Sequence, residues 1–179
     1  AGNAGLLKHA SNVSGCALAI EKLFLEAGFP EGAFQAVLVS SRNIEPLIAD
    51  ARVQGVTLTG STPAGMSVAQ LAGKYIKKSV LELGGSDPFI VLKDADLDQA
   101  AAIAVKARMQ NAGQSCIAAK RWIVEKEVAG AFTDKVSGIL QQMKQGDPFA
   151  ADTNMGPMTR HDLAEDLARQ LKQSVQQGA

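Results

Sequence analysis

Short apolar runs alternate with stretches of helical periodicity along most of this sequence. Glycine, proline or small polar residues bound the apolar runs, as they bound strands, and the hydrophobic residues between the runs recur at helical spacing. We expect strands at 6–8, 36–39, 55–59, 80–83, 88–92 and 121–124, and helices near 17–27, 44–51, 63–77, 97–109, 129–144 and 160–177. Strands that alternate with helices form βαβ units, so this order predicts an α/β fold with a parallel sheet.

The balance of charges argues against polyanionic partners. The 18 Lys and Arg residues equal the 18 Asp and Glu residues in number, so we expect no nucleic-acid partner and no attraction to an anionic membrane. No apolar run approaches the roughly 20 residues that span a bilayer. We therefore expect a globular protein with no membrane partner.

The few cysteines and histidines restrict the redox and metal chemistry. The two cysteines lack the spacing of a disulfide framework, which favours a reducing compartment such as the cytoplasm. His9 and His161 are far apart, and no group of His, Cys and carboxylate residues has the spacing of a metal site. We predict that the chain holds no metal.

Cys116 is the leading candidate for a reactive side chain, because small residues such as Gly113, Ser115 and Ala118 surround it. A buried structural thiol is the simpler interpretation of a free cysteine. We expect a helix to begin near Cys116, and its N-terminal N–H groups would stabilise an oxyanion after the thiol attacks a carbonyl. Cys16 lies on a helical pattern without a carboxylate partner, and we interpret it as core or near-core.

Glu82 is the second candidate, because it lies between Leu81 and Leu83 at the end of an apolar strand. Buried Glu is costly unless it is paired. Either this strand is at a sheet edge and Glu82 faces water, or Glu82 is a general base beside a cleft. The second interpretation is favoured, since open parallel sheets bind ligands at the carboxyl ends of their strands. Glu82 and Cys116 are too distant in sequence to share a helix face, so they would meet through the fold.

Two further segments suit an anionic ligand. Gly60-Ser61 connects a strand to a helix, and a phosphate can rest on the N-terminus of such a helix. Many βα turns have this composition, and it is not the dinucleotide-binding glycine fingerprint. Lys8 follows a strand, where a lysine is usually solvated but could reach a cofactor.

Together these motifs resemble those of the aldehyde dehydrogenase superfamily over essentially the whole chain. The motifs keep the family's order, and they are Ala1-Gly2-Asn3 with Leu7-Lys8, Thr59-Gly60-Ser61, Leu81-Glu82-Leu83-Gly84-Gly85 and Gly113-Gln114-Ser115-Cys116. Segments 85–92 and 116–121 are most similar to bacterial NAD(P)-dependent succinate-semialdehyde dehydrogenases.

The resemblance implies oxidation of an aldehyde, with succinate semialdehyde expected, to its carboxylic acid with NADP or NAD. Cys116 would form a thiohemiacetal and then a thioester, its N–H would form half of the oxyanion hole, and Glu82 would activate the hydrolytic water. For the full-length protein, the resemblance also implies a homo-oligomer, either a dimer or a tetramer. It places cofactor contacts at Lys8, Ser11, Gly60, Ser61, Leu83 and Gly84.

Two positions refine what the resemblance implies. Strongly NAD-selective relatives carry Glu where this chain has Ser11, and without that carboxylate a 2′-phosphate is not repelled and could pair with Lys8. We therefore expect that NADP is accepted. Better-known succinate-semialdehyde dehydrogenases carry an Arg for the substrate carboxylate where this chain has Gln110, and an amide cannot replace a bidentate guanidinium. Either another cation serves, or the preferred aldehyde lacks the distal acid.

The resemblance also implies a division of the chain. Residues 1–84 correspond to the latter part of a Rossmann-like NAD(P)-binding domain, and residues 85–179 to the first part of an α/β catalytic domain. The family's Pro-Trp-Asn and Glu-x-Phe-Gly-Pro motifs are not in this sequence, and both ends look cut from a longer chain. Two alternatives stay open: a non-catalytic fragment or interaction module with unused motifs, and a CoA-acylating relative, against which Glu82 argues.

Overall fold

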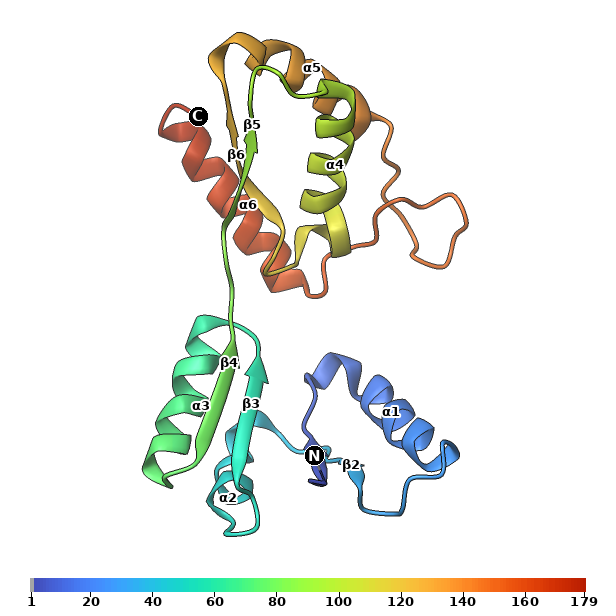
Figure 1. Ribbon diagram of the computed structural model, residues 1–179, viewed down its shortest axis with the longest axis vertical. Helices are drawn as coiled ribbons and strands as arrows, with labels where there is room; N and C mark the ends of the chain where they lie inside the picture. Colours follow the sequence, from blue (N-terminus) through green and yellow to red (C-terminus); the bar gives the residue numbers. More distant parts are fainter. Residues whose placement is uncertain (1) are drawn as a thin grey trace. The chain divides into compact units, whose positions relative to one another are not determined.

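The computed structural model describes residues 2–179 and divides the chain into two compact units, with the division between Glu82 and Leu83. Each unit combines short parallel strands with helices (Figure 1). The predicted α/β class is confirmed, and the described strands pair in parallel, two by two rather than in one sheet. The division lies two residues before the predicted boundary after residue 84. The assignment of the units to a cofactor domain and a catalytic domain stays a prediction.

The first parallel pair joins β1 (Gly5–Leu7) to β2 (Phe34–Ala36) through the crossover helix α1 (Ser14–Glu26). Phe34 of β2 stacks on Phe24 of α1 with ring centroids 4.5 Å apart, so aromatic packing fixes the helix to the strand. Strand β2 ends earlier than the run predicted at 36–39, because β1 ends at Leu7 and offers no further partner.

The second pair of the first unit joins β3 (Gly55–Thr59) to β4 (Lys78–Glu82) through α3 (Thr62–Lys74), and the short α2 (Glu45–Ala49) packs on α3. Ser61 caps α3, since its Oγ accepts a hydrogen bond from the N–H of Ala64 at 3.4 Å. Pro63 lies in the first turn, as predicted, where its missing N–H costs nothing.

The second unit has the better-developed core. Strands β5 (Asp87–Val91) and β6 (Ala119–Val124) pair in parallel, and α4 (Leu97–Met109) and α5 (Lys126–Gln141) pack together beside them. Trp122 of β6 meets Phe132 of α5 edge to face, with centroids 5.8 Å apart. The buried residues that form this core are Val91, Ala101, Ala104, Val105, Phe132 and Val136.

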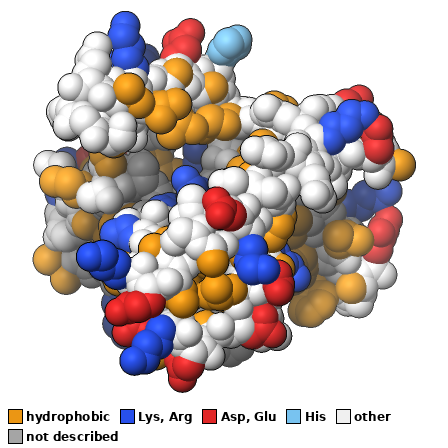
Figure 2. All heavy atoms as spheres, turned by 90° about the horizontal axis from the view of Figure 1, so that it is seen from above, with side chains coloured by type: hydrophobic (Ala, Val, Ile, Leu, Met, Phe, Trp, Pro, Cys, Tyr) orange, Lys and Arg blue, Asp and Glu red, His pale blue; other side chains and the backbone are white. Residues whose placement is uncertain are grey.

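Hydrophobic side chains also reach the surface in several places (Figure 2). The last helix, α6 (His161–Gln176), contains no buried residue. Its exposed hydrophobic residues recur every fourth position and therefore share one face: Leu163, Leu167, Leu171 and Val175. Within residues 2–179, no helix is both long enough and apolar enough to cross a membrane.

Two predictions about the cysteines are wrong. No helix begins at Cys116, because a turn closed by the hydrogen bond from the N–H of Ala118 to the carbonyl of Ser115 (3.3 Å) leads directly into β6 at Ala119. Cys16 is exposed on α1 rather than in the core, because Ala17 is the buried residue of that helix.

Candidate active site

The carboxyl ends of β3 and β4 bring two of the predicted segments together. Thr59 pairs with Glu82 in the strand register, and the N–H of Gly60 donates to the carbonyl oxygen of Glu82 at 2.9 Å. The Gly60-Ser61 turn therefore lies beside Glu82, at the kind of edge where parallel sheets bind ligands. The Glu82 side chain is exposed, which is compatible with a solvent-facing edge residue and with a base beside a cleft.

The start of α3 suits a phosphate group. This helix is 13 residues long, and its first turn carries no acidic residue. Its N-terminal N–H groups and the positive end of its dipole lie next to the exposed Gly60 and Ser61. The residues present therefore fit the diphosphate of a dinucleotide.

Lys8 and Ser11 lie close together at the carboxyl end of β1. Lys8 follows the last residue of the strand and is half-buried, whereas Ser11 is exposed and begins the short 3-10 helix η1 (Ser11–Val13). The first turn of η1 has no acidic residue, so nothing in that turn repels a phosphate. No acidic residue in the first turn of η1 therefore opposes an anion bound at Lys8.

Cys116 is exposed, and it lies three residues after a run of three left-handed residues. Asn111, Ala112 and Gly113, in the 3-10 segment η3 (Gln110–Gly113), have φ values of 53°, 54° and 77°. The N–H and the Nε2 of Gln114 both donate to the carbonyl of Asn111 at 3.1 Å, and the Nδ2 of Asn111 donates back to the carbonyl of Gln114 at 3.1 Å. These bonds hold a backbone shape that an alanine adopts at a cost.

Two contacts from more distant residues fix this left-handed segment. The Nη1 of Arg108 donates to the carbonyl of Gly113 at 3.2 Å. The N–H of Thr159 donates to the Oε1 of Gln114 at 3.0 Å, which ties the loop before α6 to the segment before Cys116. Sequence reasoning did not single out Arg108 or Gln114 for this role.

Two cations of β6 bind the stretch between β4 and β5, and one of them, Lys120, also binds the cysteine turn. The Nζ of Lys120 donates to the carbonyls of Gly85, at 2.5 Å, and of Cys116, at 3.3 Å. The Nε of Arg121 donates to the carbonyl of Ser86 at 2.8 Å. In the sequence, these contacts are indicated only by a Lys-Arg pair at the start of a strand. Such a pair is equally typical of solvated surface charge.

The remaining predicted residues fall on the stretch between β4 and β5. Leu83 is half-buried and Gly84 is exposed, and both lie outside the strands. Glu82 belongs to the first unit and Cys116 to the second, so their approach in a working site stays a prediction.

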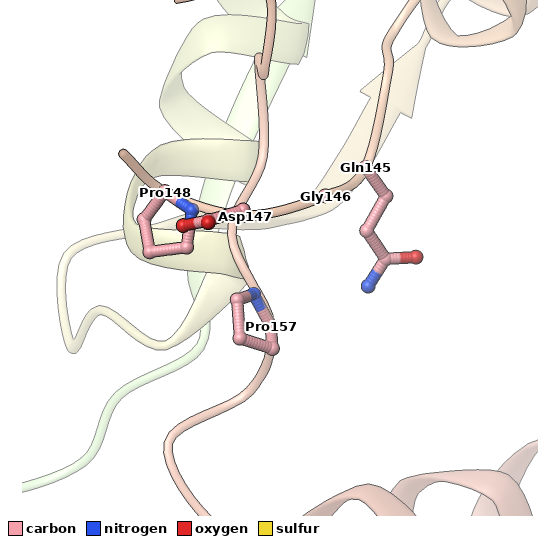
Figure 3. Close-up of a pocket in the computed structure, with 5 residues that line it drawn as sticks. All are labelled: Gln145, Gly146, Asp147, Pro148 and Pro157. Carbon is pink, nitrogen blue, oxygen red and sulfur yellow. The ribbon is translucent and has the colours of Figure 1, made fainter. Parts of the chain in front are cut away.

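An open cavity of about 530 Å³ lies in the loop between α5 and α6 (Figure 3). Its one charged lining residue is Asp147, whose Oδ1 already accepts a hydrogen bond from the N–H of Phe149 at 2.9 Å. The residues that line this cavity are Gln145, Gly146, Asp147, Pro148 and Pro157. None of them is a predicted site residue.

The carboxyl groups with shifted pKa values belong to exposed ion pairs. Hydrogen bonds from Lys74 and Tyr75 lower the pKa of Glu45, and hydrogen bonds from Arg52 lower the pKa of Asp50. These pairs stabilise the ends of α2 and α3 rather than a reaction centre. Among the described residues 2–179, no group of three or more His, Cys, Asp or Glu side chains could hold a metal ion.

The whole length of the chain matches one known protein family. Residues 1–179 match the profile described as "Aldehyde dehydrogenase family". The chain belongs to the aldehyde dehydrogenase family. The resemblance stated from the sequence is therefore confirmed.

Two bacterial relatives of this aldehyde dehydrogenase chain cover all of it. A Synechocystis sp. protein named "Probable succinate-semialdehyde dehydrogenase", specified for NADP(+), is 57% identical over 179 residues. A Mycobacterium bovis protein named "Succinate-semialdehyde dehydrogenase" 1, also specified for NADP(+), is 50% identical over 179 residues. The chain spans 39% of the length of each relative.

Two solved structures agree with the fold, and each is again matched over only part of its own length. The succinic semialdehyde dehydrogenase from Streptococcus pyogenes, solved in complex with NADP+, is 40% identical to this chain. It superposes with a TM-score of 0.94 over 99% of this chain and 39% of that chain. An NAD-dependent aldehyde dehydrogenase from Sinorhizobium meliloti, at 32% identity, gives a TM-score of 0.92 over 97% of this chain and 35% of its own.

Proposed function

We propose that the whole protein carrying this chain is an NADP-dependent aldehyde dehydrogenase that oxidises succinate semialdehyde, or a similar small aldehyde, to the carboxylic acid. The observation that supports this most strongly is that Cys116 and Glu82 each stand in an intact family signature within a chain that matches the family throughout. The two relatives named for this substrate and for NADP(+) support the finer assignment.

In this proposal, Cys116 is the nucleophile and Glu82 is the general base. The Sγ of Cys116 adds to the aldehyde carbon, and the backbone N–H of Cys116 stabilises the resulting oxyanion. The chemistry that bound NADP supplies is acceptance of the hydride that leaves this carbon. The acyl group then remains on Cys116 as a thioester. Glu82 takes a proton from water, which attacks the thioester and releases the acid and the thiol.

The residues assigned to the cofactor come from the ends of strands. Gly60 and Ser61 would hold the diphosphate at the start of α3, where no acidic side chain opposes it. Lys8 would attract the 2′-phosphate of NADP, and the neutral Ser11 would not repel it. Leu83 and Gly84 complete the proposed contacts. We expect NADP to be used at least as well as NAD.

The distal end of the substrate is the least constrained part of the proposal. Gln110 begins η3 and is exposed at the position where better-known relatives carry an Arg. Either another cation binds the distal carboxylate of the substrate, or the preferred aldehyde lacks that group. Measuring kcat/KM for succinate semialdehyde and for butyraldehyde decides between them. A clear preference for succinate semialdehyde would mean that a cation at another position binds the distal carboxylate. Equal kcat/KM values would mean that the distal carboxylate is not recognised.

A matched pair of cysteine variants tests the proposed function. Cys116→Ser should abolish NADPH formation from succinate semialdehyde, while Cys16→Ser, on the exposed face of α1, should keep it. Retained activity in Cys116→Ser, or no NADPH formation by the unaltered whole protein, would contradict the proposal. Activity that depends on added coenzyme A would favour the CoA-acylating alternative.

A further inference from the structure

We propose that Lys120 is a positioning residue, which fixes the turn that carries the Cys116 nucleophile. This inference rests on the proposed function, because it assigns Lys120 to the same site. Its evidence is the local geometry of the second unit, which holds Lys120, Cys116 and Gly85 together.

The ammonium group of Lys120 bridges two backbone carbonyls that come from different segments. It donates to the carbonyl of Cys116 at 3.3 Å and to the carbonyl of Gly85 at 2.5 Å. Hydrogen bonds from a cationic donor are stronger than those between neutral groups. One side chain therefore ties the residue that bears the thiol to the stretch that follows the Glu82 strand.

The pairing of β5 with β6 is irregular at Lys120. Asp87 pairs with Ala119 and Pro88 pairs with Arg121, so the register shifts and leaves Lys120 without a partner across the ladder. An extra residue of this kind bends the strand and re-aims a side chain, and such bulges recur beside active sites. In a regular strand, the side chains of residues 119 and 120 would simply alternate between the two faces of the sheet.

The bridged segments are also unusually close. A Cβ built on Gly85 would lie 3.0 Å from the carbonyl oxygen of Cys116, so a larger residue there would have to move the turn. Gly85 thus permits the approach that Lys120 then fixes. Arg121, which donates to the carbonyl of Ser86, holds the same stretch one residue further on.

The consequence for the reaction follows from the backbone. A bond to the carbonyl of Cys116 restrains the peptide that follows the nucleophile, and so restrains the direction of its Sγ toward the aldehyde. Misplacing a reacting group by about 1 Å can cost about 100-fold in rate. Loss of the bridge should therefore lower kcat and leave cofactor binding, which uses other residues, nearly unchanged.

The test uses three variants of the whole protein: Lys120→Met, Lys120→Arg and, as a control, Lys172→Met on the exposed surface of α6. We expect Lys120→Met to lower kcat by about 10- to 100-fold, with KM for NADP within about twofold. Lys120→Arg, which keeps a cationic donor, should recover most of the rate, and Lys172→Met should behave as the unaltered protein.

Amide hydrogen exchange gives a second readout that does not depend on turnover. In Lys120→Met, exchange should become faster in segments 84–87 and 115–118 while α5 keeps its protection. Unchanged exchange in both segments, or an unchanged kcat, would overturn the inference. If the unaltered protein forms no NADPH, the proposed function fails, and the exchange comparison still decides whether Lys120 fixes the turn.

Discussion

At the scale of single residues, the backbone before Cys116 is the most constrained part of the candidate site. Left-handed geometry costs a non-glycine residue about 1–2 kcal/mol, and here Asn111 and Ala112 both adopt it. The side-chain and backbone bonds of Gln114 hold these two residues in place. Strain of this kind is retained where the surroundings fix it, and it is frequent at functional sites.

Gly113 offers a direct test of this arrangement. Its φ is +77°, and an added Cβ would lie 2.5 Å from the Nη1 of Arg108. Gly113→Ala should lower the free energy of unfolding by about 1–2 kcal/mol and lower kcat, because the turn before Cys116 must shift. Urea unfolding and steady-state kinetics measure the two effects.

The control is Gly138→Ala in α5, where an added Cβ meets nothing within 4 Å. A helix interior favours alanine over glycine by about 1 kcal/mol, so this variant should be more stable and equally active. If Gly113→Ala matched Gly138→Ala in both measurements, the left-handed turn would have no role.

At the scale of elements, the sequence predicted the order of helices and strands better than their ends. Pro63, Ser61 and Asp96 are local signals, and the structure places each of them at the helix start expected from its chemistry. The early end of β2 was not predictable, because it depends on the length of its partner β1. Strand ends are set by pairing, which a single sequence does not reveal.

The same limit applies to the candidate site. Cys116 and Glu82 stood out because of their residue type and their neighbours. Lys120 did not, because the role proposed for it rests on a hydrogen bond to Gly85, 35 residues away in the sequence, which no local pattern indicates. The helix expected at Cys116 was wrong, since β6 begins only three residues later.

Glu45 links two elements and predicts a pH dependence. Its Oε1 accepts hydrogen bonds from the Nζ of Lys74 at 2.6 Å and the OH of Tyr75 at 2.7 Å, which lower its pKa from the usual 4.5. Since the pKa is lower in the folded state, the stabilisation is complete above pH 4.5 and is lost as the pH falls through the folded-state value.

Glu45→Gln should therefore lower the melting temperature slightly at pH 7, because the groups are exposed and the pair is screened. The difference from the unaltered protein should shrink as the pH falls below 4.5. Glu26→Gln, in an exposed pair with Lys22, is the matched control. A difference that grew toward low pH would contradict the sign of the shift.

At the scale of the whole molecule, exposed apolar surface determines whether this chain associates when it is expressed by itself. Leu167, Leu171 and Val175 on α6 are 51%, 65% and 59% exposed. Contiguous exposed hydrophobic surface drives association. We expect the 179-residue chain, expressed by itself, to oligomerise or aggregate in light scattering. A clean monomer with a cooperative melt would contradict this expectation.

The most direct test of the proposed function is to look for the thioester on Cys116. In the whole protein, Glu82→Gln removes the proposed base but leaves the thiol, so acylation should proceed and hydrolysis should stall. After mixing with NADP and succinate semialdehyde, peptide mass spectrometry should find a succinyl group on Cys116, with about one NADPH formed per chain. Full turnover by Glu82→Gln with no adduct on Cys116 would contradict the mechanism.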